Sequence, residues 1–381
     1  MTKKKIKIVA DNGILFLKGV LEEYADILYL PSGEITSQNI KDADAIIVRT
    51  RTKCDKNLLE NTKVRFIATG TMGYDHIDAD YCQSKNIKWI NAPGCNANSV
   101  LQYMASALLI LAERMKMNLL DKTIGIIGVG NIGQKVERFA NLLGMKVLLN
   151  DPPQQRKEGN SKFVDINYLI EQSDIITLHV PLNLDGIDKT YHMANESFFS
   201  RFNYPKIFIN TSRGEVVQSS ALKDAFREKL VSAYVLDVWE DEPNIDLELL
   251  HYAALATPHI AGYSVEGKAN GTAVCVNELN KFFNLGLKAN WYPSSLPKPD
   301  KSNEINVHCK GKSLQEIFFE CITHTYNITE DDKNLRISPS QFEQQRINYP
   351  IRREFYFYKV RLINADSQVR DKIKEIGFNL I

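Results

Sequence analysis

The chain has 381 residues, of which 44% are hydrophobic, and its 47 Lys and Arg nearly balance its 46 Asp and Glu. This length predicts two or three domains, and this composition is typical of a folded globular protein rather than a disordered one. With a net charge of +1, the chain lacks the broad positive potential that proteins use to bind nucleic acids or anionic membranes. We therefore expect neither partner.

The six cysteines are scattered and form no C-x-x-C pair, which excludes the usual zinc spacings and a disulfide framework. We therefore expect that the protein binds no metal, that its cysteines are free thiols, and that it is located in the cytoplasm. The basic N-terminal segment has too short an apolar run for a signal peptide. The most apolar segment, Ser99–Ala112, contains Gln102 and is too short to span a bilayer, so it predicts a buried helix.

The first third of the chain alternates short β-branched runs with helix-like segments. Three of these runs predict strands, at Ile6–Ala10, Ala43–Arg49 and Val64–Gly70. Each run is almost continuously apolar, as parallel strands covered on both faces are. This portion is expected to be α/β with its own sheet.

A helix is predicted at 99–116, followed by a segment whose pattern predicts strand, glycine turn, helix and strand. Four further strands are predicted, at Asp174–Val180, Lys206–Thr211, Ser232–Val238 and Leu255–Ile260. This succession indicates a doubly wound parallel sheet. After about residue 290 the character changes, because Trp291–Glu304 is rich in Pro and Ser and indicates a linker. Alternation in Glu354–Leu362 predicts a strand, and a helix follows it.

A G-x-G-x-x-G motif lies between the apolar strand and the amphipathic helix of the central segment. Its glycines are Gly128, Gly130 and Gly133, with Asn131 and Ile132 inside the loop. The first glycine permits a tight turn, the second lets a pyrophosphate approach the backbone, and the third lets helix and strand pack closely. Free N–H groups at the helix start then bind the phosphate charge. The alternative is a strand–helix turn that binds nothing.

Asp151 ends the strand that follows this helix. A carboxylate at this position hydrogen-bonds the adenosine ribose and repels a 2′-phosphate, which favours NAD over NADP. Arg156 and Lys157 follow closely and could weaken that repulsion, so the strictness of the preference stays open. Asp151 could also be only a turn or capping residue.

Three short stretches at predicted strand ends carry residues suited to oxidising a 2-hydroxy acid. Arg213 can grip a carboxylate and polarise a neighbouring carbonyl. His259 is the expected acid/base for the hydroxyl proton, and Glu242 can fix its tautomer and stabilise the imidazolium. Asp237 could accept a hydrogen bond from the nicotinamide carboxamide. Each of these residues alone is more often structural than catalytic.

The chain is similar to the D-isomer-specific 2-hydroxyacid dehydrogenases over roughly its first 285 residues. The matching motifs are TMGYDHID (Thr71–Asp78), GVGNIG (Gly128–Gly133), HVPL (His179–Leu182), TSRGEVV (Thr211–Val217), DVWEDEP (Asp237–Pro243) and PHIAG (Pro258–Gly262). The resemblance implies a doubly wound Rossmann-type NAD-binding domain (96–259) inserted into a split, flavodoxin-like α/β substrate domain (1–95 and 260–288), with the active site in the cleft. A small α+β C-terminal domain (289–381) follows.

On matching positions, the resemblance makes Arg213, Glu242 and His259 catalytic. It implies further NAD contacts, at Asp151, Val180, Thr211, Ser212, Arg213, Asp237 and Gly262. Three residues match substrate contacts, Thr50, Thr71 and Tyr263, with Thr50 standing where serine is expected. Gln102 stands where many relatives carry Glu, on a helix away from the chemistry.

Four features, including the segments Asp331–Arg336 and Asn348–Phe355 of the extra C-terminal domain, narrow the resemblance to a homodimeric member that oxidises a phosphorylated 2-hydroxy acid. Cations for that phosphate would come from Arg49, Arg51, Arg352 or Arg353, although each could equally be an ordinary surface arginine. Two alternatives stay open. One is a dehydrogenase of the phosphoglycerate or glycerate type, and the other an NAD-sensing, co-repressor-like binding protein.

Overall fold

The computed structural model describes residues 5–159 and 162–381. Its contacts divide the chain into two compact units, each built from two stretches of sequence. One comprises Met1–Asn96 with Ser264–Pro297, and the other Ala97–Tyr263 with Lys298–Ile381. Among the described residues, none of the helices is long and apolar enough to cross a membrane.

The first unit contains a five-stranded, all-parallel sheet in the order β2-β1-β3-β4-β5, the strand order of flavodoxin-like folds. Its strands are β1 (Ile6–Asp11), β2 (Ala25–Leu30), β3 (Ala45–Val48), β4 (Phe66–Thr69) and β5 (Lys88–Ile90). Its helices are α1 (Ser37–Ile40), α2 (Lys56–Leu59), α3 (Ala79–Ser84) and α11 (Val265–Phe283).

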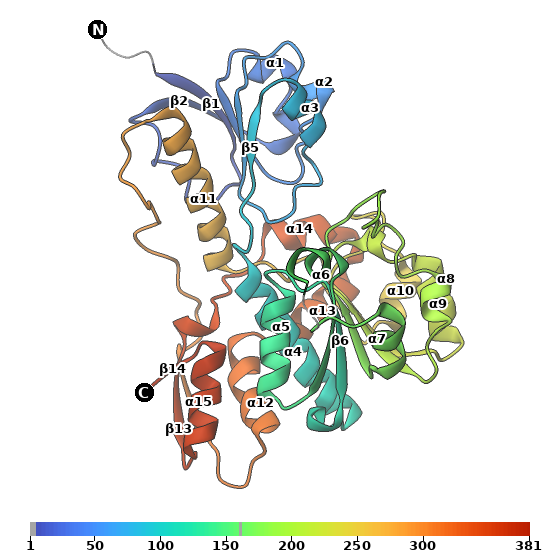
Figure 1. Ribbon diagram of the computed structural model, residues 1–381. Helices are drawn as coiled ribbons and strands as arrows, with labels where there is room; N and C mark the ends of the chain where they lie inside the picture. The colour runs from blue at the N-terminus through green and yellow to red at the C-terminus, as the bar shows by residue number, and fades with distance from the viewer. Residues whose placement is uncertain (1–4, 160–161) are drawn as a thin grey trace. The chain divides into compact units, whose positions relative to one another are not determined.

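Both faces of this sheet are buried, which explains its continuous apolar runs. Val9 and Ile46 belong to a core with residues of α1, α2 and α3, whereas Ile8 and Ile47 belong to a second core with Leu279 of α11. The long helix α11 therefore completes the first unit although it follows the whole central segment in sequence (Figure 1).

The second unit is built on a six-stranded, all-parallel sheet in the order β11-β10-β9-β8-β6-β7. Its strands are β6 (Thr123–Ile127), β7 (Lys146–Asn150), β8 (Ile175–Leu178), β9 (Lys206–Asn210), β10 (Val231–Leu236) and β11 (Leu255–Ala256). Its helices are α4 (Ala97–Met115), α5 (Gly133–Leu142), α6 (Pro152–Glu158), α7 (Ile166–Gln172), α8 (Glu196–Phe199), α9 (Ser219–Arg227) and α10 (Leu247–Tyr252). The strand order reverses between β6 and β8, and open α/β sheets bind ligands at such a point.

The C-terminal part of this unit adds a three-stranded parallel sheet, β12-β13-β14. Its strands are β12 (Glu304–His308), β13 (Lys359–Ile363) and β14 (Asn379–Leu380). Its helices are α12 (Leu314–Thr325), α13 (Ile328–Ile337), α14 (Phe342–Ile347) and α15 (Ser367–Ile376). The strand expected at Glu354–Leu362 begins only at Lys359, because Phe355–Phe357 form a 3₁₀ turn.

Helix α4 is the predicted buried helix, and two of its buried polar residues, Gln102 and Ser106, bind the C-terminal part. Gln102 Nε2 donates to Thr325 Oγ1 (3.1 Å) and to the Arg353 carbonyl (2.9 Å). Ser106 Oγ donates to the Tyr326 carbonyl (3.0 Å). These hydrogen bonds pair the Gln102 amide nitrogen and the Ser106 hydroxyl inside an apolar interior, whereas Gln102 Oε1 is buried without a hydrogen-bond partner among the described residues.

Candidate active site

The glycine loop turns at the end of β6 and leads directly into α5. Gly128 has φ +87°, and a Cβ on it would lie 2.6 Å from the His179 carbonyl oxygen, so no larger residue fits. A Cβ on Gly133 would lie 2.1 Å from the Gly128 oxygen, which allows α5 to start against the turn. A Cβ on Gly130, in contrast, would meet nothing within 4 Å. This open cradle at a helix N-terminus fits a dinucleotide pyrophosphate.

Asp151 follows β7 and is 9% exposed. Its Oδ2 accepts a hydrogen bond from Val129 N–H (2.8 Å) in the glycine loop, and its Oδ1 accepts from Gln154 N–H (2.9 Å) at the start of α6. The carboxylate is therefore both a helix cap and a brace for the loop. Each oxygen keeps a lone pair that a ribose hydroxyl can use.

Residues that follow β8 and β9, on the other side of the switch point, pack around the glycine loop. Val180, which follows β8, packs beside Gly128, since a Cβ there would stand 2.9 Å from its Cγ1. His179 lies between two hydroxyls, with Nε2 3.1 Å from Thr177 Oγ1 and Nδ1 3.3 Å from Thr211 Oγ1. Burial lowers the pKa of His179 to about 3, so this imidazole is neutral. It braces the cofactor side of the sheet rather than carrying charge.

Arg213 extends from the turn after β9, where Ser212 donates to Asn210 through both its N–H and its hydroxyl. Gly214 follows, and a Cβ on it would lie 1.9 Å from the Trp239 carbonyl oxygen. Only glycine therefore lets this turn reach the loop that carries Glu242. Arg213, Glu242 and His259 line one pocket of about 280 Å³.

His259 lies in a tight turn after β11, which is shorter than the predicted Leu255–Ile260. His259 itself has φ +56°, a left-handed conformation that is uncommon outside glycine. The carboxylate of Asp237 organises this turn, accepting from Thr257 Oγ1 (2.6 Å), Ile260 N–H (2.8 Å) and Ala261 N–H (2.9 Å). Asp237 is 1% exposed, and this burial raises the pKa of its carboxyl group.

Nδ1 of His259 is 2.8 Å from Oε2 of Glu242. Oε1 of Glu242 accepts from Trp239 N–H (3.0 Å), and Trp239 Nε1 donates to the Thr257 carbonyl (2.9 Å), so the two loops are joined. Burial raises the pKa of Glu242, but His259 outweighs it by charge and hydrogen bond, and the pKa is lowered overall. Glu242 therefore stays ionised and, because it can only accept, holds the Nδ1 proton in place.

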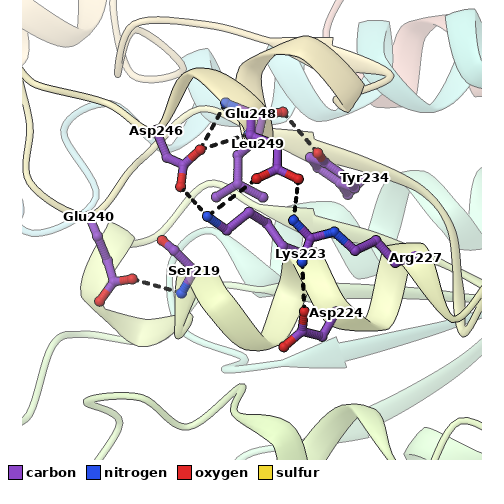
Figure 2. Close-up of polar contacts among 9 residues, drawn as sticks. All are labelled: Ser219, Lys223, Asp224, Arg227, Tyr234, Glu240, Asp246, Glu248 and Leu249. Atoms are coloured by element: carbon purple, nitrogen blue, oxygen red, sulfur yellow. Dashed lines mark hydrogen bonds and ion pairs between the residues drawn. The ribbon is translucent and has the colours of Figure 1, made fainter.

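Side-chain contacts on the far side anchor the Glu242 loop to α9. Glu240 Oε2 accepts from Ser219 N–H (2.7 Å), and Lys223 Nζ pairs with Asp246 (2.7 Å), as Figure 2 shows. Oε1 of Glu240 lies 2.6 Å from His192 Nε2. These contacts hold the loop at both ends. Little conformational entropy is therefore lost when Glu242 forms its hydrogen bond with His259.

Two features near this pocket were missed from the sequence. The first is the His192–Glu240 pair. The second is Arg346 of α14, whose positive charge contributes to lowering the pKa of Glu242 and whose guanidinium lies 5.9 Å from the Tyr263 ring centroid. His192 lies far from Glu240 in sequence, and Arg346 lies far from Glu242 and Tyr263. No sequence motif marks either feature. Across residues 5–159 and 162–381, no cluster of three or more His, Cys, Asp or Glu could hold a metal ion.

The other expected substrate contacts fall in different parts of the molecule. Thr50 is exposed two residues after the end of β3. Thr71 lies two residues after the end of β4, with its hydroxyl 2.9 Å from Thr69 Oγ1, and both residues belong to the first unit. Tyr263 of the second unit packs edge-on against Tyr349. Gly262 precedes it in the turn that Asp237 holds.

The arginines expected for a phosphate differ in their surroundings. Nε of Arg49 pairs with the buried Asp11 carboxylate (3.0 Å), whereas Arg51 is exposed. Arg352 and Arg353 are only 4% and 7% exposed, so the interpretation of these two as surface arginines is wrong. Their guanidinium groups stack on Tyr326 (4.5 Å) and Phe357 (4.0 Å).

Known proteins match both the fold and the sequence. Residues 106–261 match the model of the D-isomer specific 2-hydroxyacid dehydrogenase NAD-binding domain, and residues 296–377 match a domain of unknown function (DUF3410). Among solved structures, a D-lactate dehydrogenase from Aquifex aeolicus, complexed with NAD and lactic acid, is 26% identical with a TM-score of 0.63 and covers 77% of this chain and 100% of its own. An NAD+-bound 3-phosphoglycerate dehydrogenase from Entamoeba histolytica is 27% identical with a TM-score of 0.63, covering 74% and 96%.

Curated relatives extend the match over nearly the whole chain. A Bacteroides fragilis protein named erythronate-4-phosphate dehydrogenase is 43% identical over 357 residues, covering 93% of this chain and 99% of its own. An Escherichia coli protein of the same name is 35% identical over 379 residues, covering 99% of both. The doubly wound domain, its glycine loop and these matches define the chain as an NAD-dependent oxidoreductase. It belongs to the D-isomer-specific 2-hydroxyacid dehydrogenases and, within them, to the erythronate-4-phosphate dehydrogenase family. The predicted family, fold class and cofactor are thus confirmed.

Proposed function

We propose that the chain oxidises 4-phospho-D-erythronate to (R)-3-hydroxy-2-oxo-4-phosphonooxybutanoate with NAD, a step of pyridoxal 5′-phosphate (vitamin B6) biosynthesis. Family membership at 43% identity supports this substrate. The observation that carries the chemistry is the 2.8 Å contact between His259 Nδ1 and Glu242 Oε2 in a pocket that Arg213 also lines.

In this reaction His259 takes the C2 hydroxyl proton through Nε2, the ring nitrogen that Glu242 does not engage. Glu242 holds the tautomer that leaves Nε2 free to accept and stabilises the charge that then develops. Arg213 binds the substrate carboxylate and polarises the oxygen at C2 as it becomes a carbonyl. When bound, NAD supplies the acceptor for the C2 hydride.

The cofactor is held, in this proposal, by residues at the carboxyl ends of β6 to β11. The Gly128–Gly133 loop would hold the pyrophosphate, and Asp151 would bind the ribose hydroxyls. The rest of the cofactor site is lined, in this proposal, by Val180, Thr211, Ser212 and Gly262. Asp237 organises the turn through three accepted hydrogen bonds, two at Oδ1 and one at Oδ2, and its expected contact with the nicotinamide carboxamide, for which Oδ2 keeps a lone pair, stays a prediction. The contacts from Thr50, Thr71 and Tyr263 to substrate remain predictions.

The assembly and location belong to the same proposal. We expect a cytoplasmic homodimer formed through residues 289–381, in which Ile351 and Tyr356 are 43% and 47% exposed. Sedimentation velocity of the full chain tests the assembly. A species of twice the 43.3 kDa monomer mass supports the dimer, and a species of one monomer mass at micromolar concentration contradicts it.

The substrate is tested by following absorbance of reduced nicotinamide with NAD and each of three acids, 4-phospho-D-erythronate, 3-phosphoglycerate and glycerate. The proposal expects the highest kcat/KM for phosphoerythronate. A preference for either other acid favours a dehydrogenase of the phosphoglycerate or glycerate type. NAD binding without turnover of any acid favours an NAD-sensing binding protein.

A further inference from the structure

Two side chains of the C-terminal part hold the segment that carries His259, one at each end. At the start of the segment, Asp332 Oδ1 accepts a hydrogen bond from Ala256 N–H (2.8 Å). At its end, Arg352 Nη2 donates to the Ala261 carbonyl (2.5 Å). Asp332 and Arg352 both lie in the region that matches the domain of unknown function, 296–377.

Arg352 is held rigidly before it reaches this segment. The residue is 4% exposed, and its guanidinium lies 4.5 Å from the Tyr326 ring centroid and makes a second, longer contact with the Ser99 carbonyl (3.4 Å). Asp331 interacts with Arg352 through charge and accepts from the hydroxyls of Tyr326 and Tyr349, each at 2.8 Å. These contacts restrict the position of the guanidinium, although its buried Nε has no hydrogen-bond partner in the described part of the chain, and through Nη2 they hold the Ala261 carbonyl.

Asp332 is anchored in the same way at the other end. It is 8% exposed on α13, and its Oδ1 also accepts from Arg336 Nε (3.0 Å). Ala256 is the last residue of β11, the edge strand of the six-stranded sheet. Asp332 thus satisfies a backbone donor where the next strand would otherwise pair.

Between these two contacts the backbone takes the left-handed conformation at His259, with φ +56°. A non-glycine residue keeps such a conformation only when its surroundings over-determine it. Asp237, which directly follows β10, holds the turn from the side of the sheet through Ile260 N–H and Ala261 N–H. The ends of the turn are fixed from outside the sheet, by Asp332 and Arg352.

From this arrangement we infer that Asp332 and Arg352 are positioning residues for the reaction, and that the C-terminal domain sets the geometry of His259 within its own chain. The inference rests on the proposed role of His259 as acid/base. It gives the domain a task separate from dimerisation. Small displacements of a catalytic group cost about 10²-fold in rate even when the substitution lies away from the chemistry.

The test compares Arg352→Met with Arg352→Lys, and uses Arg370→Met as the matched control. Arg370 Nη2 also donates to a backbone carbonyl, that of Leu362 (2.9 Å), but within the C-terminal domain. Arg352→Met is expected to lower kcat by about 10²-fold while KM for NAD changes less than about twofold. Arg352→Lys, which keeps a donor, is expected to recover part of kcat, and Arg370→Met to keep it.

Hydrogen exchange of the 256–263 backbone, measured without substrate, separates this inference from the proposed function. Faster exchange in Arg352→Met but not in Arg370→Met supports the positioning role, and a folded Arg352→Met enzyme with wild-type kcat and exchange overturns it. If wild type turns over no acid, the proposed function fails while the exchange data still decide whether Arg352 holds the turn. If Arg352→Met does not fold, the pair Asp332→Asn and Asp332→Ala decides. The asparagine keeps the Oδ1 acceptor, so it should retain more kcat than the alanine, and equal kcat in both contradicts the inference.

Discussion

Glu242 accepts a hydrogen bond from His259 through one carboxylate oxygen and from Trp239 N–H through the other. The Trp239 contact fixes the carboxylate, and the His259 contact fixes the imidazole. The His259 imidazole is therefore oriented by a carboxylate that is itself held in place, in a loop anchored to α9 through Glu240 and Lys223.

Glu242→Gln keeps the size of the side chain but removes its charge and its exclusive role as acceptor. The amide can face His259 with either its oxygen or its nitrogen, so the tautomer is no longer enforced. We expect kcat to fall by roughly 10²-fold and the pH–rate profile to shift. A pH series of kcat/KM for both enzymes checks this. A variant profile that superimposes on that of wild type contradicts the dyad.

His179 predicts how stability depends on pH. Burial lowers its pKa from 6.5 to about 3, so below pH 6.5 the unfolded chain binds a proton that the folded protein does not. The free energy of unfolding therefore decreases as the pH falls from 6.5 towards 3, by up to roughly 1.4 kcal/mol for each pH unit. In His179→Gln this loss disappears, and the unfolding free energy should vary less over that range. Urea unfolding at pH 7 and pH 4.5 measures the pH dependence, and an identical dependence in both proteins contradicts the account.

Asp151→Asn tests the cofactor preference. The amide keeps an acceptor for the glycine loop or for α6, while the charge that repels a 2′-phosphate is gone. The ratio of kcat/KM for NADP to kcat/KM for NAD should rise about tenfold. This is the change expected when roughly 1.4 kcal/mol of repulsion between like charges is lost. The wild-type enzyme, assayed with both cofactors, is the control. A ratio that stays constant would mean that Asp151 acts only as a cap and brace.

The parts of the fold that could be predicted are those fixed by local pattern. Runs such as Ala45–Val48 and Phe66–Thr69 are buried on both faces, so their apolar character alone marks them as strands. The glycine loop was predictable because close backbone contacts at the turn itself require glycine at positions 128 and 133. His259 and Glu242 were found through motifs whose order along the chain matched a family.

Other elements could not be predicted because tertiary contacts decide them. β2 is an edge strand with partly exposed side chains, and β5 has only three residues, and both were missed from the sequence. The strand expected at Leu255–Ile260 ends at Ala256 because the chain then turns, and in that turn Asp237, about twenty residues upstream in sequence, accepts from the N–H groups of Ile260 and Ala261. Nothing in the sequence around Arg352 indicates that it is buried. In the structure its guanidinium packs on the Tyr326 ring and donates to the Ala261 carbonyl.

The most direct test of the whole account is His259→Ala assayed with NAD and 4-phospho-D-erythronate, alongside NAD affinity measured by calorimetry. Without the imidazole nothing accepts the hydroxyl proton, whereas the glycine loop and Asp151 are untouched. We predict a fall in kcat of about 10²–10⁴-fold with NAD affinity near that of wild type. Turnover that survives the substitution at the wild-type rate would show that the reaction does not pass through this histidine.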